Sequence, residues 1–462
     1  MNIKQGSNKR KKHWVVAGGS LGGITAAYNL LISNNDVTLI ESAPVIGGVN
    51  NSICWGDFTL DFGCHLFGNE DDTTTALLMD LMDNQVVSVD PIIASITNGI
   101  KTEHIEYPDL TSFGSRQVSL ALYDLIENIN SDNYEGMAGR SMIELLSHRY
   151  GVTTANIISD TLKKLTQTDV SNLSADCFEA LPCRRVKIVN DESAKLLKAL
   201  PVFDDLILRS SPDEPMFHYG KTANIFPSRA YYPLTGGMGG FSLRAHSKLE
   251  KMGAKIRLKS KINNIECKSD TFNITFNDTE KQIADGLIWA AGGETLSKVV
   301  NIKNNLDAQI HKIPLILYYF DMNSTQASKY SYIHDFDDTH FIYRASIPSN
   351  YAPNVCPEGR SYLCCEIPTN TDSDIWNSPE KYEQLIWDEA LSIGIVTGIK
   401  PLNSLIKNVP VSYKFPKVNL YEELQPIISW IKQQKNIFLL DQTIFAKSSI
   451  VRYVSDICSE LS

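Results

Sequence analysis

Apolar runs and amphipathic stretches alternate near the amino terminus in the order strand, helix, strand. Residues 14–17 are apolar and lead into a glycine-rich turn, and residues 23–33 carry apolar side chains at helical spacing. A second β-branched run follows at 36–40 and ends at Glu41. This order predicts a βαβ unit in which the glycine turn faces a ligand.

The same patterns predict helices in the middle of the chain and mainly strands after it. Apolar spacing over residues 117–210 indicates a helical region, and shorter helices are expected over 74–82 and 379–394. A short hairpin is expected over 98–111, around the turn pair Asn98-Gly99. Strands are expected over 255–265, 272–276, 286–290, 313–320, 339–345 and 360–366, and a closing strand and helix within 436–460.

The turn after the first strand has the spacing of a dinucleotide-binding motif. Gly18 permits a tight turn, and Gly23 lets the following helix lie close to the sheet. The backbone N–H groups of the turn and the positive end of the helix can then face a pyrophosphate. Glu41 stands where an acidic residue accepts hydrogen bonds from an adenosine ribose. Ser20 replaces the middle glycine of the motif and adds a Cβ there.

Further segments follow in an order that resembles one enzyme superfamily. They are Gly47-Gly48, Asp61-Phe-Gly63-Cys-His65-Leu-Phe67, the glycine-rich stretch 232–241 with the strand around Ile262, and 287–293. Together they are similar to the FAD-binding segments of the amine oxidase and protoporphyrinogen oxidase superfamily. The form Asp-x-Gly-x-His-x-Phe resembles its UDP-galactopyranose mutase-like branch.

The resemblance implies that FAD is the cofactor. Carried over residue by residue, it implies cofactor contacts at Gly18, Ser20, Gly23, Glu41, Gly47, Gly48, Gly237, Ile262, Gly292 and Asp441. Two positions depart from the family pattern: Val49 replaces an arginine, and Leu440 stands where a glycine usually precedes the acid. A leucine at a close-approach position would crowd the cofactor.

The resemblance and the patterns predict an α/β chain, α+β overall, built on a Rossmann-like FAD-binding domain. An inserted helical region and an antiparallel substrate-binding sheet complete it. The expected divisions are a flexible tail (1–12), the FAD-binding domain (13–116 and 211–300), a helical substrate or cap region (117–210), an antiparallel sheet with a helix (301–435), and a closing strand and helix (436–462).

Composition narrows the class of protein. The net charge of −10 makes nucleic acid a poor partner. No apolar run approaches the ~20 residues that span a bilayer. The nine cysteines lack a C-x-x-C pair and the start of the chain lacks a signal-peptide core, so we expect reduced thiols in the cytoplasm. The histidines have no metal-ligand spacing, and no metal is expected.

Five side chains are candidates for chemistry or substrate binding. The resemblance places His65 beside the flavin ring, where an imidazole can hydrogen-bond the flavin or relay a proton; a core histidine bonded to the backbone is the alternative. Arginines bind a diphosphate bidentately, although many arginines simply face solvent. The substrate candidates are Arg184, Arg229, Tyr232 and Arg344.

Three hypotheses about function follow. The first is an FAD-dependent oxidoreductase that acts on a small organic substrate, since the flavin itself supplies the redox chemistry. The second is a mutase-like enzyme that acts on a nucleotide sugar in surface polysaccharide biosynthesis. The third, suggested by Ser20, Val49 and Leu440, is a catalytically degenerate flavoprotein homologue.

Overall fold

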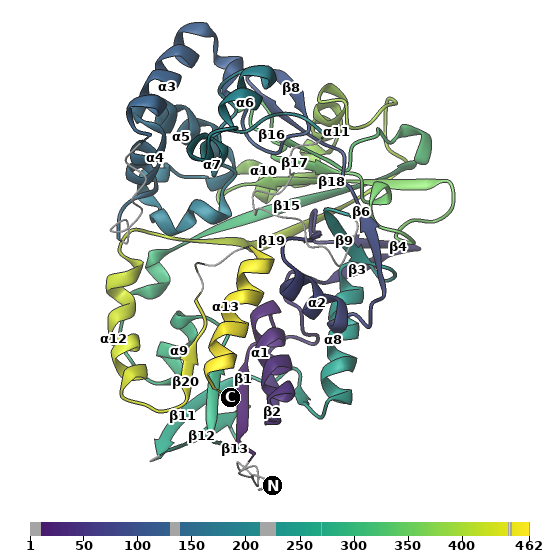
Figure 1. Ribbon diagram of the computed structural model, residues 1–462. Coiled ribbons are helices and arrows are strands. Elements are labelled where there is room, and N and C mark those ends of the chain that lie inside the picture. Colours follow the sequence, from purple (N-terminus) through teal and green to yellow (C-terminus); the bar gives the residue numbers. More distant parts are fainter. Residues whose placement is uncertain are drawn as a thin grey trace, which may run out of the picture.

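A parallel sheet forms the base of the molecule. The computed structural model describes residues 11–129, 139–212, 228–268, 270–441, 443 and 446–461. Five strands pair in parallel (lower half of Figure 1). In spatial order they are β10 (Lys255–Arg257), β2 (Asp36–Ile40), β1 (His13–Ala17), β14 (Gly286–Trp289) and β20 (Ile437–Leu439). Alternate residues of the central strands are buried on opposite faces, as expected for a covered parallel sheet.

Helices cover one face of this sheet, and a small sheet with further helices covers the other. The first face packs on α1 (Leu21–Ile32), α8 (Gly239–Lys251) and α13 (Lys447–Glu460). The second face packs on the antiparallel strands β11 (Ile262–Lys268), β12 (Thr271–Phe276) and β13 (Glu280–Ala284) and on α9 (Gly293–Val299) and α12 (Leu420–Lys432). This is the architecture of a dinucleotide-binding domain.

A seven-stranded sheet lies across the middle of the molecule (Figure 1). All neighbours are antiparallel except the parallel pair β16 and β7. In spatial order the strands are β19 (Asn403–Pro416), β15 (Ile310–Asn323), β18 (Arg360–Pro368), β17 (Arg344–Ser346), β16 (Tyr332–Asp335), β7 (Ile93–Thr97) and β8 (Ile100–Glu103).

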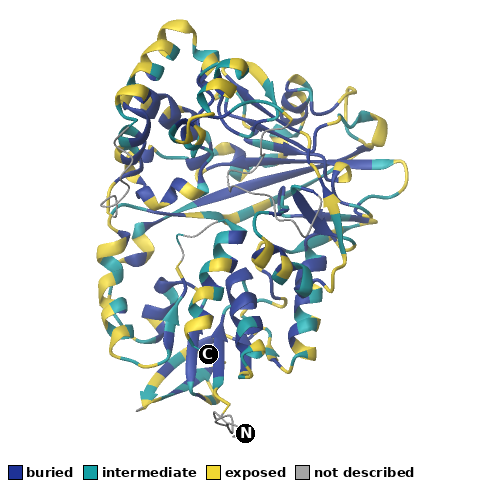
Figure 2. Ribbon diagram, in the orientation of Figure 1, coloured by how far each residue is buried: buried dark blue, intermediate teal, exposed yellow. Residues whose placement is uncertain are grey.

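The two faces of the seven-stranded sheet have different neighbours. One face packs on α11 (Glu383–Ser392), with α10 (Asp374–Asn377) alongside. The other face turns toward the parallel-sheet part, and its end is covered by the helical region. That region consists of α3 (Ser115–Glu127), α4 (Met142–Tyr150), α5 (Val152–Thr166), α6 (Asp191–Leu197) and α7 (Pro201–Leu206). In Figure 2 the strands of both sheets are mostly buried and the outer helix faces are exposed.

Short elements join the parallel-sheet part to the seven-stranded sheet. They are the hairpin β3 (Ser52–Trp55) and β4 (Phe58–Asp61), the strands β5 (Phe67–Gly68), β6 (Val86–Val89) and β9 (Ala230–Pro233), and α2 (Asp72–Leu81). Phe67 of β5 stacks on Tyr231 of β9, with 5.6 Å between the ring centroids. These elements carry several residues that the sequence singles out.

The predicted fold class is confirmed, as are the βαβ unit, the helices within 117–210 and the closing strand and helix. The predicted hairpin turn is confirmed, since Asn98 and Gly99 both have positive φ between β7 and β8. The extent predicted for the hairpin, 98–111, is wrong, because its strands are Ile93–Thr97 and Ile100–Glu103 and a 3-10 helix begins at Leu110. Within the described chain, no helix combines the length and apolarity needed to cross a bilayer. Residues 1–10 of the expected tail lie outside the described residues.

Two strand predictions are wrong in extent. The run 255–265 is divided between β10 and β11, which belong to different sheets, because Lys259 adopts a positive φ of 50° at the turn between them. The run 339–345 contributes only its last two residues to β17; Thr339 instead donates its hydroxyl to Asp337 in a turn. Two long elements, β19 and α12, were not predicted.

Leu440 is part of the core between α1 and α13. It is 7% exposed, and its Cδ1 lies 3.1 Å from the position that a Cβ on Gly22 would take. The absence of a side chain at Gly22 therefore makes room for Leu440. The sequence suggested that this side chain would crowd the cofactor. In the structure it packs against the first turn of α1 instead.

We expect Leu440→Ala to destabilise the protein. Deleting this buried side chain leaves a cavity against Gly22, which costs about 2–4 kcal/mol of unfolding free energy. A urea-unfolding midpoint measures this, and Leu402→Ala, which shortens an exposed leucine, is the control. An equal midpoint for Leu440→Ala and the wild type would contradict the packing role.

Candidate functional site

Two glycines at the junction of β1 and α1, Gly18 in the turn and Gly23 in the first turn of the helix, leave no room for a side chain. Gly18 has φ of +100°, and a Cβ there would lie 3.1 Å from the carbonyl carbon of Ala290. A Cβ on Gly23 would lie 1.8 Å from the carbonyl oxygen of Gly18. The Ser20 side chain does not cap α1, and the first turn of α1 carries no acidic side chain. The amino end of this helix can therefore receive an anion.

Glu41, at the end of β2, is held against this turn. Its carboxylate accepts hydrogen bonds from the N–H groups of Gly19 and Ala43, each at 2.7 Å. Gly47 donates its N–H to the carbonyl oxygen of Gly19 at 2.6 Å. The structure thus brings the acid and the second glycine pair to the first glycine turn.

The remaining predicted residues of this half lie nearby. Gly48 faces Ser20, since a Cβ on Gly48 would be 4.0 Å from that of Ser20. Gly292 is the N-cap of α9, directly after β14, and accepts a hydrogen bond from the Trp289 indole at 2.8 Å. Ile262 belongs to the same core cluster as Ile40. The glycine turn after β1, the uncapped amino end of α1 and the Glu41 carboxylate together fit the ADP half of FAD.

Asp61 organises the second half of the site. Its buried carboxylate accepts hydrogen bonds from the Ser52 hydroxyl at 2.6 Å, the Met238 N–H at 3.0 Å and the Tyr232 hydroxyl. Burial raises the pKa of Asp61, and these donors act in the opposite direction by stabilising the carboxylate. A Cβ on Gly237 would lie 2.7 Å from this carboxylate, so only glycine fits there.

His65 lies on the segment that follows Asp61, and Lys447, the first residue of α13, reaches the same segment. His65 places Nε2 3.2 Å from the carbonyl oxygen of Phe62, which suits the tautomer that donates from Nε2. Burial, with Lys447 and Arg344 close by, holds the pKa of His65 well below its usual value, so the ring is neutral at pH 7. Lys447 donates to the carbonyl oxygen of Leu66 at 2.8 Å, and burial lowers its pKa to about 8.

Arg344 and Glu366 attach the seven-stranded sheet to this segment. The guanidinium binds the carboxylate bidentately, with Nε–Oε1 at 2.6 Å and Nη2–Oε2 at 2.7 Å. Glu366 also accepts the N–H of Cys64 at 2.9 Å. A Cβ on Gly63 would lie 2.8 Å from the Glu366 carboxyl carbon, which explains the glycine in the Asp-x-Gly-x-His segment.

The structure does not bring every predicted residue to this centre. Arg184 pairs with Glu179 at 2.9 Å on the helical region. Arg229 donates its side chain to the carbonyl oxygen of Pro212. Asp441 is exposed and accepts both the N–H and the hydroxyl of Thr443 at 2.8 Å.

Sequence reasoning missed three side chains of the centre. Asp61 stood in a quoted motif, but nothing local indicated that its donors come from residues 52, 232 and 238. Glu366 and Lys447 carry no recognisable motif. Their roles depend on contacts between segments far apart in the chain.

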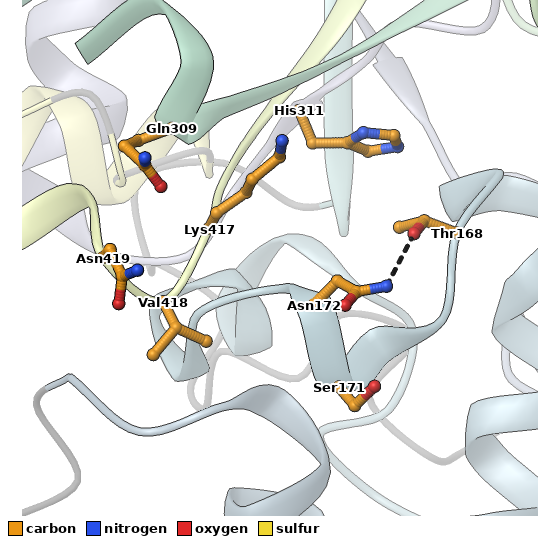
Figure 3. Close-up of a pocket in the computed structure, with 8 residues that line it drawn as sticks. All are labelled: Thr168, Ser171, Asn172, Gln309, His311, Lys417, Val418 and Asn419. Atoms are coloured by element: carbon orange, nitrogen blue, oxygen red, sulfur yellow. Dashed lines mark hydrogen bonds between the residues drawn. The ribbon is translucent and has the colours of Figure 1, made fainter. Parts of the chain in front are cut away.

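A separate polar pocket lies where the helical region meets β15 and β19 (Figure 3). Its volume is about 360 Å³. It is lined by Thr168, Ser171, Asn172, Gln309, His311, Lys417, Val418 and Asn419, none of which the sequence singled out. In the described part of the chain, no group of three or more His, Cys, Asp or Glu residues could hold a metal ion.

Solved structures share this fold over nearly the whole chain. A reduced UDP-galactopyranose mutase matches with a TM-score of 0.71 at 15% identity, covering 98% of this chain and 94% of that one. A redesigned putrescine oxidase matches with a TM-score of 0.63 at 13% identity, covering 98% of each chain. Cyclohexylamine oxidase from Brevibacterium oxydans gives a TM-score of 0.62 at 12% identity, covering 98% and 99%. At such identities the likeness shows a common fold.

Sequence comparison gives the family. No curated protein matches the chain. The family model described as "Flavin containing amine oxidoreductase" matches residues 21–408, which is most of the 462 residues. The resemblance expected from the glycine segments is therefore confirmed, and the chain belongs to the flavin-containing amine oxidoreductase family.

Proposed function

We propose that this protein is an FAD-dependent oxidoreductase that acts on a small organic substrate. The proposal rests mainly on the contacts of Glu41 and Gly47 with Gly19. These contacts bring two glycine turns, and a carboxylate that can accept hydrogen bonds from a ribose, to the amino end of α1. FAD, when bound, supplies hydride acceptance. The nine cysteines are free thiols, which is consistent with the proposed cytoplasmic location.

In this proposal the chain positions the cofactor and the substrate. Asp61 fixes the turn at Gly237 and Met238 through its hydrogen bonds, so that backbone groups of this turn stay in place. The neutral ring of His65 can donate one hydrogen bond and accept another. The buried ammonium of Lys447 places positive charge beside the same segment.

The mutase-like alternative is supported by the Asp-x-Gly-x-His-x-Phe form and by the shared fold. Binding a diphosphate, however, requires arginines that are free to meet it. Arg344 is paired bidentately with Glu366, and Arg184 and Arg229 hydrogen-bond to other parts of the chain. Those contacts favour the oxidoreductase. The packing of Leu440 on Gly22 removes one of the three residues on which the degenerate alternative was based.

We expect Gly18→Val to abolish FAD retention. The substitution places a β-branched side chain at a φ of +100° against Ala290, where the pyrophosphate would approach. Gly253→Val is the matched control, because Gly253 has φ of +104° but open space around its Cβ. Flavin absorbance per chain after purification, with the melting temperature of both variants, measures the effect. A full flavin complement in Gly18→Val would show that this turn is wrongly assigned.

Glu41→Ala should weaken FAD binding. Loss of a charge-assisted acceptor for the ribose costs about 1.5–3 kcal/mol, which is roughly a 10- to 150-fold rise in Kd. Titration calorimetry of FAD into the apoprotein measures this Kd. Glu280→Ala, which removes an exposed carboxylate paired with Arg257 at 3.0 Å, should leave the Kd unchanged. An unchanged Kd for Glu41→Ala counts against the ribose contact.

His65→Ala should retain FAD and shift the flavin reduction potential, because the imidazole is expected to hydrogen-bond the ring. His311→Ala is the matched control, since His311 is also half-buried and bonds a backbone carbonyl through Nε2, at 2.7 Å. Spectroelectrochemical titration of both variants gives the potentials. If His65 has only a core role, its variant loses about 1–3 kcal/mol of stability and keeps the wild-type potential.

A further inference from the structure

The polar pocket of Figure 3 shares no lining residue with the cofactor site described above. Its walls come from three parts of the chain: residues 168–172 of the helical region, residues 309–311 at the start of β15, and residues 417–419 between β19 and α12. Its volume of about 360 Å³ equals that of roughly twelve water molecules in the liquid. Ligand pockets begin at roughly 300 Å³, so this one has room for a small metabolite.

Backbone hydrogen bonds join the walls of this pocket. The N–H of Lys417 donates to the carbonyl oxygen of Gln309 at 2.9 Å, and the N–H of Ser174 donates to the carbonyl oxygen of Pro416 at 2.8 Å. The first bond holds the end of β19 to the start of β15, and the second holds it to the helical region. Because these bonds use main-chain atoms, the side chains of the pocket stay available to a ligand, and the walls lose little freedom when it binds.

Lys417 supplies the positive charge of the pocket. Figure 3 shows its ammonium between the side chains of Gln309 and His311. Among the described residues, no carboxylate oxygen lies within 4 Å of this ammonium. Burial, with the charge of Lys417 close by, lowers the pKa of His311, so the imidazole is neutral at pH 7. Lys417 is therefore the cation that a ligand in the pocket meets.

No carboxylate lines the pocket, and carboxylates of the adjoining segments have other partners. Asp169 and Glu423 each accept a backbone N–H at 2.9 Å, and Asp307 binds the Lys312 ammonium at 2.7 Å. Glu422 is exposed on the first turn of α12, outside the lining. A pocket lined by charge of one sign attracts a ligand of the opposite sign, so the lining favours an anion.

The neutral groups of the lining can donate hydrogen bonds from separate walls. Gln309 and Asn419 carry amides and Ser171 carries a hydroxyl, and the Asn419 side chain makes no capping bond to α12. A carboxylate has its two oxygens in one plane, whereas a phosphate group spreads at least three acceptor oxygens around a tetrahedral centre. Donors on three walls suit the phosphate, and lysine is a common phosphate ligand.

We propose that Lys417, Gln309, Asn419 and Ser171 bind a phosphate group, either as the free ion or as the monoester of a small metabolite. The volume beyond the phosphate holds the organic part of such an ester. The site is separate from the glycine turn after β1, so the inference does not depend on the proposed function. A ligand held by all three walls stabilises the contact of the helical region with β15 and β19.

The test is titration calorimetry with sodium phosphate, sn-glycerol 3-phosphate and sodium malonate, a dicarboxylate. Excess FAD is present throughout, and sodium chloride keeps the ionic strength constant. The variants are Lys417→Gln and Ser171→Ala. Lys432→Gln is the matched control, because Lys432 is an exposed lysine at the far end of α12, about 20 Å along the helix from Asn419. The melting temperature of each variant is measured without a probe.

At least one of the two phosphate probes should bind the wild type and Lys432→Gln with the same Kd. Lys417→Gln should raise this Kd about tenfold or more, and Ser171→Ala roughly two- to tenfold, because the first removes a charged donor and the second a neutral one. Malonate should bind at least roughly tenfold more weakly than that probe. The probe that binds more tightly shows whether the free ion or an ester is the ligand.

Three results would overturn the inference: no binding of either phosphate probe, the same Kd in Lys417→Gln as in the wild type, or malonate binding as tight as that of the phosphate probes. The second result would place the bound phosphate elsewhere, for example at the glycine turn after β1. Without a probe, Lys417→Gln should melt with the wild type. If it melts lower, Ser171→Ala decides, and an unchanged Kd in that variant overturns the inference.

Discussion

The carboxylate of Asp61 is the contact on which the centre of this molecule depends. It is buried, and its hydrogen-bond donors come from three segments: Ser52 on β3, Tyr232 on β9 and the N–H of Met238 at the start of α8. A buried carboxylate is costly unless such donors surround it. The same requirement that keeps Asp61 satisfied therefore fixes the turn before α8 against the hairpin that carries Asp61. An apolar residue at this position would leave all three donors without their acceptor.

Close approach of backbone to backbone determines the other half of the site. Gly23 lies on the carbonyl oxygen of Gly18, and Gly47 donates to Gly19, so the turn, α1 and the second glycine pair form one rigid unit. Leu440 departs from the family pattern without disturbing this unit. Gly22 has no side chain, and the space that this leaves holds the Leu440 side chain. The Arg344–Glu366 pair then couples the unit that carries Asp61 to the seven-stranded sheet.

Local patterns made the βαβ unit, the hairpin at Asn98 and the helical region predictable, since each depends on neighbours in the chain. The two elements that were not predicted, β19 and α12, have apolar patterns that are interrupted by proline. In β19 the alternation of Leu405, Val409 and Phe415 is interrupted by Pro410, and α12 contains Pro426 inside an apolar helical spacing. The candidate site was predictable only where a motif marks it, at the glycine turns. Glu366 meets Arg344 through strand pairing, and Asp61 meets Tyr232 and Met238 through hydrogen bonds from a segment about 170 residues further along the chain.

The central claim is that this chain is built to hold FAD. Purified protein, denatured to release its cofactor and analysed by chromatography against an FAD standard, tests it most directly. We predict one FAD per chain, either as purified or after incubation with FAD and removal of the excess. A folded protein that is colourless and takes up no FAD would contradict the account, because Gly18, Gly23 and Glu41 would then serve only the packing of the βαβ unit.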